Sequence, residues 1–168
     1  GGTGGTLIGG GNTGGAPPET PPILYVHTNT TLFQGDATKP DLGITPIGDF
    51  TCIGGPGQET SLTDVAVSAT GELWGITQTT VYKLEISGNK VNCVQPIQLQ
   101  NPNSLRFYGL TFAPKGVIDP NEEVLIAGNT AGELWQVDAD GGLTQRGTLG
   151  IVPANDGNGH TYPNAGKK

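Results

Sequence analysis

The chain has 168 residues and a formal net charge of −7, and its eight lysines and arginines are scattered along it. This distribution argues against a nucleic-acid partner, because neutralising phosphates requires a clustered positive face. No apolar run approaches the roughly 20 residues of a membrane-spanning helix, so we expect no membrane span.

The first 22 residues differ in composition from the rest of the chain. Nine of the 29 glycines fall within positions 1–15, and prolines follow them. Such a segment is typical of a flexible leader, and it could tether the protein to a surface. We therefore expect a leader at 1–22, a folded core at 23–150 and a polar tail at 151–168.

The core consists of short runs rich in Val, Ile, Thr, Leu and aromatic residues, separated by Gly, Asn, Asp and Pro. No segment keeps a helical period for more than two turns, so the pattern predicts an all-β fold. The runs fall into four types that follow one another in order. The first type covers 62–67 and 107–112; the second 23–27, 72–76 and 123–127; the third 31–34, 80–85 and 132–138; the fourth 44–50, 93–97 and 143–149.

Each run of the third type carries one aromatic residue at the corresponding place, namely Phe33, Tyr82 and Trp135. Their spacings of 49 and 53 residues are close to the length of one propeller blade with long loops. The spacing therefore predicts an internal repeat of four-stranded antiparallel units.

The succession of the runs LWGIT, TVYKLEISGN and CVQPI resembles the blade repeats of secreted bacterial β-propellers, in which an LYG-like strand precedes an LYxID-like strand. The resemblance covers about residues 23–150 and implies a partial β-propeller of four-stranded blades. It implies no particular function. Fewer than three complete units are present, so we expect one uncovered apolar face at each end and no closed monomer. A β-sandwich is the alternative architecture.

Cys52 and Cys93 are the only cysteines. An even count in a polar, Gly- and Thr-rich chain favours one disulfide and an extracytoplasmic location, whether secreted, periplasmic or at the cell surface. Two separate buried thiols are the alternative.

The aromatic residues allow two interpretations. One aromatic per strand at the repeat spacing is typical of packing, so we expect Trp74 and Trp135 to be largely buried. Tyr25 and Tyr108 are the candidates for aromatic residues on an interaction surface.

The sequence contains no complete catalytic or metal-binding pattern. His27 and His160 have no nucleophile motif beside them. Residues 138–141 (DADG) begin like a calcium loop, but Leu149 stands where the twelfth-position glutamate is required, so a hairpin turn is favoured. We expect no catalytic residue, no metal and no cofactor.

The sequence thus favours a non-catalytic interaction or structural module, which binds a protein partner or forms a homo-oligomer that covers the open faces. The alternative is a fragment of a propeller hydrolase or lyase whose active site lies in missing blades.

Overall fold

The computed structural model describes residues 23–100 and 104–149. The expected leader at 1–22 and tail at 151–168 lie outside these residues. All eleven runs expected to be strands are strands, and the described residues contain no helix, which confirms the all-β class. The strands are β1 (Ile23–His27), β2 (Thr31–Asp36), β3 (Thr45–Phe50), β4 (Asp64–Val67), β5 (Leu73–Ile76), β6 (Thr80–Ser87), β7 (Lys90–Gln98), β8 (Phe107–Ala113), β9 (Val124–Asn129), β10 (Glu133–Val137) and β11 (Leu143–Thr148).

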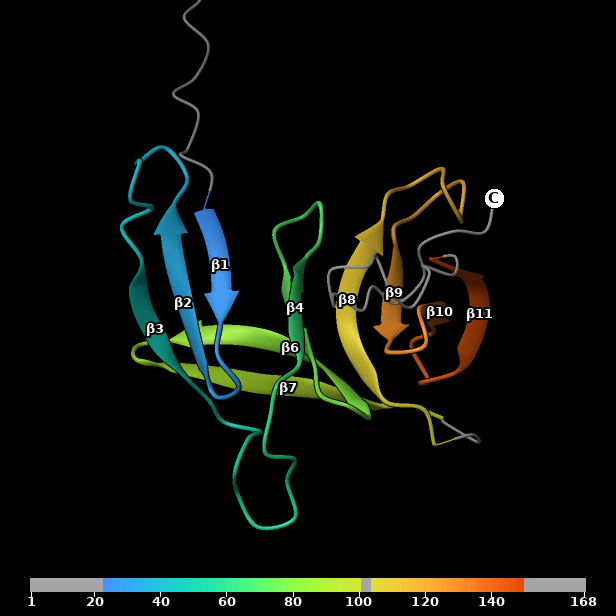
Figure 1. Cartoon of the computed structure of the whole chain (residues 1–168), viewed down its shortest axis with the longest axis horizontal. Coiled ribbons are helices and arrows are strands. Elements are labelled where there is room, and N and C mark those ends of the chain that lie inside the picture. The colour runs from blue at the N-terminus through green and yellow to red at the C-terminus, as the bar shows by residue number, and fades with distance from the viewer. Residues whose placement is uncertain (1–22, 101–103, 150–168) are drawn as a thin grey trace, which may run out of the picture.

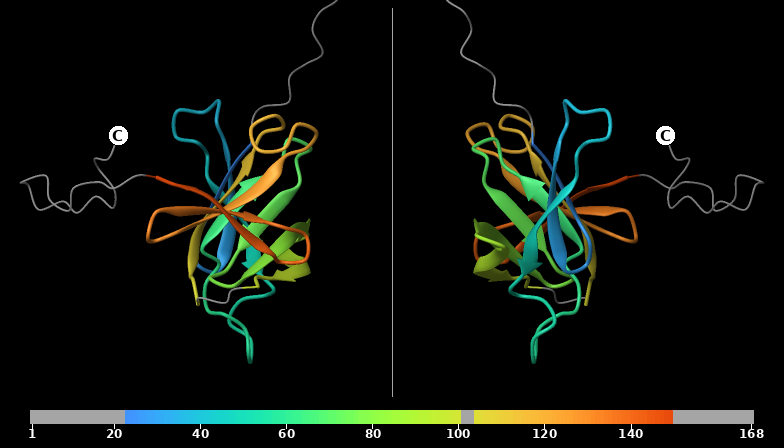
Figure 2. Two further views of the ribbon diagram at one scale, coloured as in Figure 1. Left: turned by 90° about the vertical axis from the view of Figure 1, so that its right-hand side faces the viewer. Right: turned by 90° about the vertical axis from the view of Figure 1, so that its left-hand side faces the viewer.

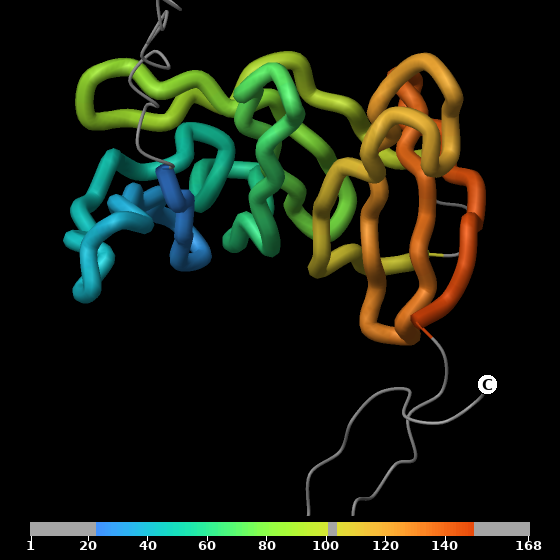
Figure 3. Tube along the Cα trace, turned by 90° about the horizontal axis from the view of Figure 1, so that it is seen from above, coloured from blue at the N-terminus to red at the C-terminus, as the bar shows by residue number. Residues whose placement is uncertain are grey.

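The strands form three groups in a row: β1–β3, β4–β7 and β8–β11 (Figure 1). Within each group, consecutive strands pair antiparallel. Seen from above, the middle group lies between the other two (Figure 3). We call them the first, middle and last groups.

The first two groups are joined into one mixed sheet of seven strands, in the order β1-β2-β3-β7-β6-β5-β4. The junction is a short parallel pairing of β3 with β7, in which Asp49 lies opposite Lys90 and Phe50 opposite Val91. This differs from the expected separate four-stranded sheets, because the fourth-type strands of two neighbouring groups meet at their ends. The last group is a separate antiparallel sheet.

The predicted disulfide between Cys52 and Cys93 is present and clamps this parallel junction. The two Cα atoms lie 5.6 Å apart, within the range that a disulfide spans. Thr51 reinforces the contact: its backbone N–H donates to the carbonyl oxygen of Val91, and its hydroxyl accepts a hydrogen bond from the Cys93 amide at 3.1 Å. The disulfide therefore ties the first group to the middle group.

Two hydrophobic cores lie between neighbouring groups. The first core joins the middle and last groups and contains Ala66, Ile76, Val81, Leu99, Phe107, Leu110, Ala127 and Val137. The second core joins the first and middle groups and contains Leu32, Phe50, Cys52, Leu62, Leu73, Leu84 and Val91.

The middle group buries both of its faces, because side chains alternate along each strand. The paired residues Ile76 and Val81 belong to the first core and face the last group. The paired residues Leu73 and Leu84 belong to the second core and face the first group. We call the face toward the next group in chain order the forward face, and the opposite one the backward face.

The turn between β10 and β11 packs against the chain that follows β7, and it requires glycine at position 141. Gly141 has a φ of +86°, and a Cβ there would overlap the carbonyl oxygen of Gln98. Its own carbonyl accepts a hydrogen bond from the Gln100 amide at 2.8 Å. Gly71 is a matched control, with a φ of +84° and nothing within 4 Å of a Cβ.

We expect Gly141→Ala to lower the free energy of unfolding by about 1–3 kcal/mol more than Gly71→Ala does. Both variants incur the cost of a left-handed backbone, so the difference isolates the steric overlap. Urea unfolding of the two variants measures it, and equal losses would show that the turn does not pack against Gln98.

Candidate interaction surfaces

The forward face of the last group has an apolar centre. Ala127 and Trp135 lie on the face of the last group that packs against the first core. Gly128 pairs with Leu134, and because side chains alternate along a strand, both lie on the opposite face. Ile126 lies on that opposite face as well. Leu134 is half-buried and packs against neither core, whereas Ile126 is buried at 6% exposure. Together with Gly109 and Leu149, these residues line a hollow of about 400 Å³. The floor of the hollow is formed by Gly109 and Gly128, at positions where the middle group carries larger side chains.

The backward face of the first group is apolar as well. Val26 pairs with Phe33 and Leu24 pairs with Gly35, and none of the three apolar side chains belongs to either core. A Cβ on Gly35 would meet the Cδ1 of Ile44, so the Ile44 side chain lies over this face. Leu24 and Ile44 are 38% and 43% exposed. Figure 2 views the molecule from both ends, toward β8–β11 and toward β1–β3.

We call these two surfaces the forward end face (Ile126, Gly128, Leu134 and Leu149) and the backward end face (Leu24, Val26, Phe33 and Ile44). Among the residues that the structure describes, no strand group lies beyond either of them. The incomplete repeat predicts an uncovered apolar face at each end, and that these two surfaces are those faces stays a prediction.

The two tyrosines named as interaction candidates lie in different places. Tyr25 is half-buried and packs against the second core. Tyr108 is 43% exposed and lines the hollow of the forward end face, and its hydroxyl accepts a hydrogen bond from the Gln78 side chain at 3.0 Å. Geometry thus associates only Tyr108 with an end face, and an interaction role for either residue stays a prediction.

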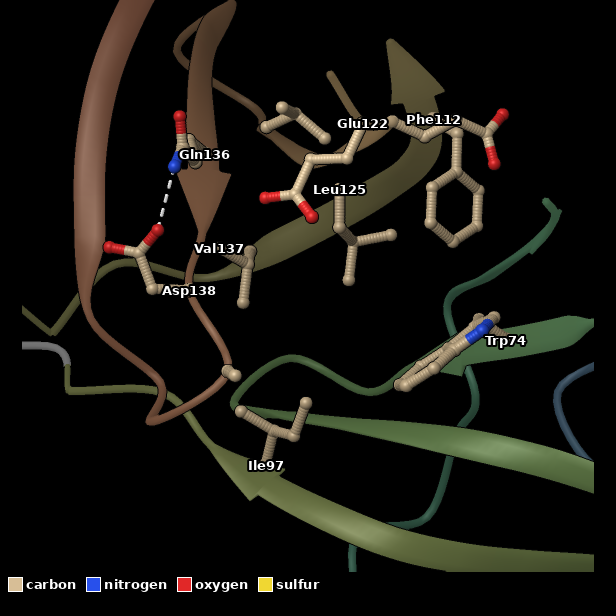
Figure 4. Close-up of a pocket in the computed structure, with 11 residues that line it drawn as sticks. Trp74, Ile97, Phe112, Glu122, Leu125, Gln136, Val137 and Asp138 are labelled. Carbon is tan, nitrogen blue, oxygen red and sulfur yellow. Dashed lines mark hydrogen bonds between the residues drawn. The ribbon is translucent and has the colours of Figure 1, made fainter. Parts of the chain in front are cut away.

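The two tryptophans are less buried than expected. Trp74 and Trp135 are both half-buried and both pack against the edge of the first core. Trp74 also lines a notch of about 400 Å³ between the middle and last groups, with Ile97, Phe112, Leu125 and Val137 (Figure 4). Glu122, Glu123 and Asp138 line it as well. The notch is the open margin of a core, and this position explains the partial exposure of Trp74.

Residues 138–141, which begin like a calcium loop, form the hairpin turn between β10 and β11. The Gly141 amide donates to the carbonyl of Asp138, and the Asp140 carboxylate accepts a hydrogen bond from the Gly142 amide at 2.9 Å. The Asp138 carboxylate accepts one from the Gln136 side chain at 2.7 Å (Figure 4). In the described part of the chain, no three His, Cys, Asp or Glu side chains are placed to hold a metal ion.

Asp64, at the start of β4, contacts both neighbouring groups, through His27 of β1 and Leu110 of β8. Its carboxylate accepts hydrogen bonds from the amides of Val65 at 2.9 Å and Leu110 at 2.7 Å, and it lies 3.8 Å from Nε2 of His27. Nδ1 of His27 lies 2.9 Å from the Thr28 carbonyl oxygen, so the ring donates there and turns Nε2 toward Asp64. The pair was missed from the sequence because residues 27 and 64 meet only through tertiary packing.

The contact shifts both pKa values toward the charged forms. The Asp64 carboxylate raises the pKa of His27, with help from the Thr28 carbonyl, and outweighs the opposing effect of burial. Burial acts to raise the pKa of Asp64, but His27 and the amides of Leu110 and Val65 outweigh it and lower that pKa. The contact therefore favours the charged forms of both side chains.

Stability is expected to fall as the pH rises through the pKa of folded His27, above its ordinary value of 6.5. The contribution is complete below 6.5 and amounts to at most about 1 kcal/mol, because the pair is partly exposed. Asp64 contributes to stability as the charged carboxylate, and this contribution is lost at acid pH, as the pH falls below 3.8. Urea unfolding between pH 5.5 and 8.5 tests the first effect. His27→Gln should abolish the slope attributed to this pair, and an unchanged slope would rule the pair out as its origin.

No family model matches the chain, and no curated protein is similar to it. No helix among the described residues is long and apolar enough to cross a membrane.

Proposed function

We propose that the chain is a non-catalytic, extracytoplasmic interaction module, built as a partial β-propeller whose end faces bind a protein partner or a further copy. The observation that carries the proposal is the pair of apolar end faces outside both cores. Leu149 on the forward end face and Leu24 and Ile44 on the backward end face are exposed to solvent. Removing exposed apolar surface from water is favourable, so such surface marks interaction sites.

The blade interpretation is favoured over a sandwich by the way the groups pack. A sandwich has two sheets and one core between them. Here the middle group buries apolar side chains on both faces, against a different neighbour on each. A row of sheets that each stack on the next is the arrangement of propeller blades.

The disulfide supports an oxidising, extracytoplasmic setting, because such bonds persist where thiols are not kept reduced. The polar contacts of His27 and Asp64 support a structural role rather than catalysis, since both side chains connect strands from different groups. An enzyme fragment remains the alternative only if catalytic residues are supplied from outside the described residues.

Photo-crosslinking tests the proposal directly. A benzoylphenylalanine at position 149 places the probe beside the hollow, where Leu149 is 69% exposed. Val117 is a matched control at 68% exposure, in the loop between β8 and β9. In an extract of the source cells, we expect a discrete crosslinked product from position 149 and none from position 117. Equal labelling at both positions, or no product at 149, would contradict an interaction surface there.

A further inference from the structure

We propose that the notch between the middle and last groups binds an arginine side chain of a protein partner. The notch shares no lining residue with either end face, so this inference goes beyond the proposed function and does not rest on it. The evidence is a recess that combines accessible aromatic side chains with carboxylates that lack an ionic partner among the described residues.

The notch offers apolar side chains that solvent reaches. Trp74 of the middle group and Phe112 and Leu125 of the last group line it, and all three are half-buried. Its volume of about 400 Å³ lies within the range of ligand pockets. A flat guanidinium group can stack on an aromatic ring in such a recess, while the methylene stem of the arginine packs on the neighbouring apolar side chains.

Carboxylates give the notch a negative charge. Glu122, Glu123 and Asp138 line it, and no lysine or arginine among the described residues does. None of the three takes part in an ion pair within residues 23–100 and 104–149. Figure 4 shows the Asp138 carboxylate and the Trp74 ring on opposite sides of the notch. Charge complementarity therefore favours a cation over a neutral or anionic occupant.

Two basic side chains lie next to residues of the notch, and each already has another partner. Lys83 is the cross-strand neighbour of Trp74 and forms an ion pair with Glu72. Arg146 donates two hydrogen bonds to the side-chain oxygen of Gln136, at 2.6 and 2.9 Å. Neither cation pairs with a carboxylate of the notch, so the complementary charge comes from another molecule.

Hydrogen bonds hold two of the carboxylate-bearing residues in place without a ligand. The Asp119 carboxylate accepts hydrogen bonds from the amides of Asn121 at 2.7 Å and Glu122 at 3.2 Å, which fixes the end of the loop between β8 and β9. The Glu123 carboxylate accepts one from the Ala69 amide of the middle group at 2.9 Å. A site ordered in advance loses little freedom on binding, which favours affinity.

Arginine fits these features better than lysine. Its guanidinium group is planar, stacks on aromatic faces and presents five N–H donors, so that it can bond more than one carboxylate at once. Arginine is also enriched among the residues that contribute most to binding at protein interfaces. We therefore assign the notch to an arginine side chain of a protein.

An NMR titration of the full chain with a capped Gly-Arg-Gly peptide tests this site, and the same peptide with citrulline in place of arginine is the neutral match. Trp74 and Trp135 are the only tryptophans, so the chain gives two indole N–H signals, and only Trp74 lines the notch. We expect the arginine peptide to shift the Trp74 signal saturably and to leave the Trp135 signal in place. The citrulline peptide should bind about tenfold more weakly, because it lacks the charge-assisted hydrogen bonds.

Glu122→Gln removes one carboxylate from the notch, and the exposed position of Glu122 keeps the folded interior intact. Asp41→Asn is the matched control, since Asp41 is exposed in the first group, between β2 and β3. Glu122→Gln should weaken the arginine peptide about threefold, as for a partly exposed charge pair, and the control should not. No saturable shift of the Trp74 signal, equal affinity for the two peptides, or an unchanged affinity in Glu122→Gln would overturn the site. The crosslink from position 149 judges the proposed function separately, so either can fail alone.

Discussion

Replacing both cysteines with serine is expected to lower the free energy of unfolding by about 4 kcal/mol. The bond joins residues separated by 41 positions, and in the chain-entropy account a loop of that length costs the unfolded chain this much freedom. The disulfide also holds the β3–β7 junction, where the parallel pairing involves only two residue pairs. Loss of the bond should therefore loosen the contact between the first and middle groups before the last group is affected.

Urea unfolding with and without reductant measures this effect. Reduction should destabilise the wild type by the same amount and leave the double-serine variant unchanged. Alkylation of two thiols in unreduced, denatured protein would show that the bond is absent and would contradict the prediction.

Phe107→Ala is expected to lower the free energy of unfolding by about 3–5 kcal/mol, because it empties a large site in the first core. Phe107 is 0% exposed at the start of β8. Its amide donates to the carbonyl of Gln78, and its carbonyl accepts a hydrogen bond from the Thr63 hydroxyl at 3.1 Å, so the backbone around it is held on both sides. This rigidity limits relaxation around the cavity.

Tyr108→Ala is the matched control, since Tyr108 is the next residue in the same strand and is 43% exposed. It should cost less than about 1 kcal/mol, in the range of surface substitutions. Chemical denaturation of both variants measures the contrast, and similar losses would mean that Phe107 does not anchor the contact between the middle and last groups.

The strands were predictable from sequence because each one is signalled locally. The β5 run LWGI and the β10 run ELWQV combine apolar and aromatic residues, and each closely follows a turn glycine, Gly71 or Gly132. Both form where expected. The disulfide was predictable as well, since Cys52 lies just after the fourth run of the first unit and Cys93 begins the fourth run of the next, and neighbouring units bring these segments close.

The parallel pairing of β3 with β7 was not predictable, because it depends on how closely two groups approach. Gly48 allows this approach: a Cβ there would overlap the carbonyl oxygen of Asn89 in the β6–β7 turn. A glycine inside a strand signals a close approach but does not identify the neighbour. The contact of His27 with Asp64 escaped prediction for the same reason, as did the partial exposure of Trp74 at the margin of a core.

Radical footprinting of the full chain tests association through the two end faces most directly. Leu149, Ile44 and Val117 are all exposed aliphatic side chains, and only the first two belong to the end faces. If the end faces bind a further copy, oxidation of Leu149 and Ile44 should fall as the protein concentration rises, while oxidation of Val117 stays constant. Unchanged oxidation of both end-face residues would contradict association through these faces.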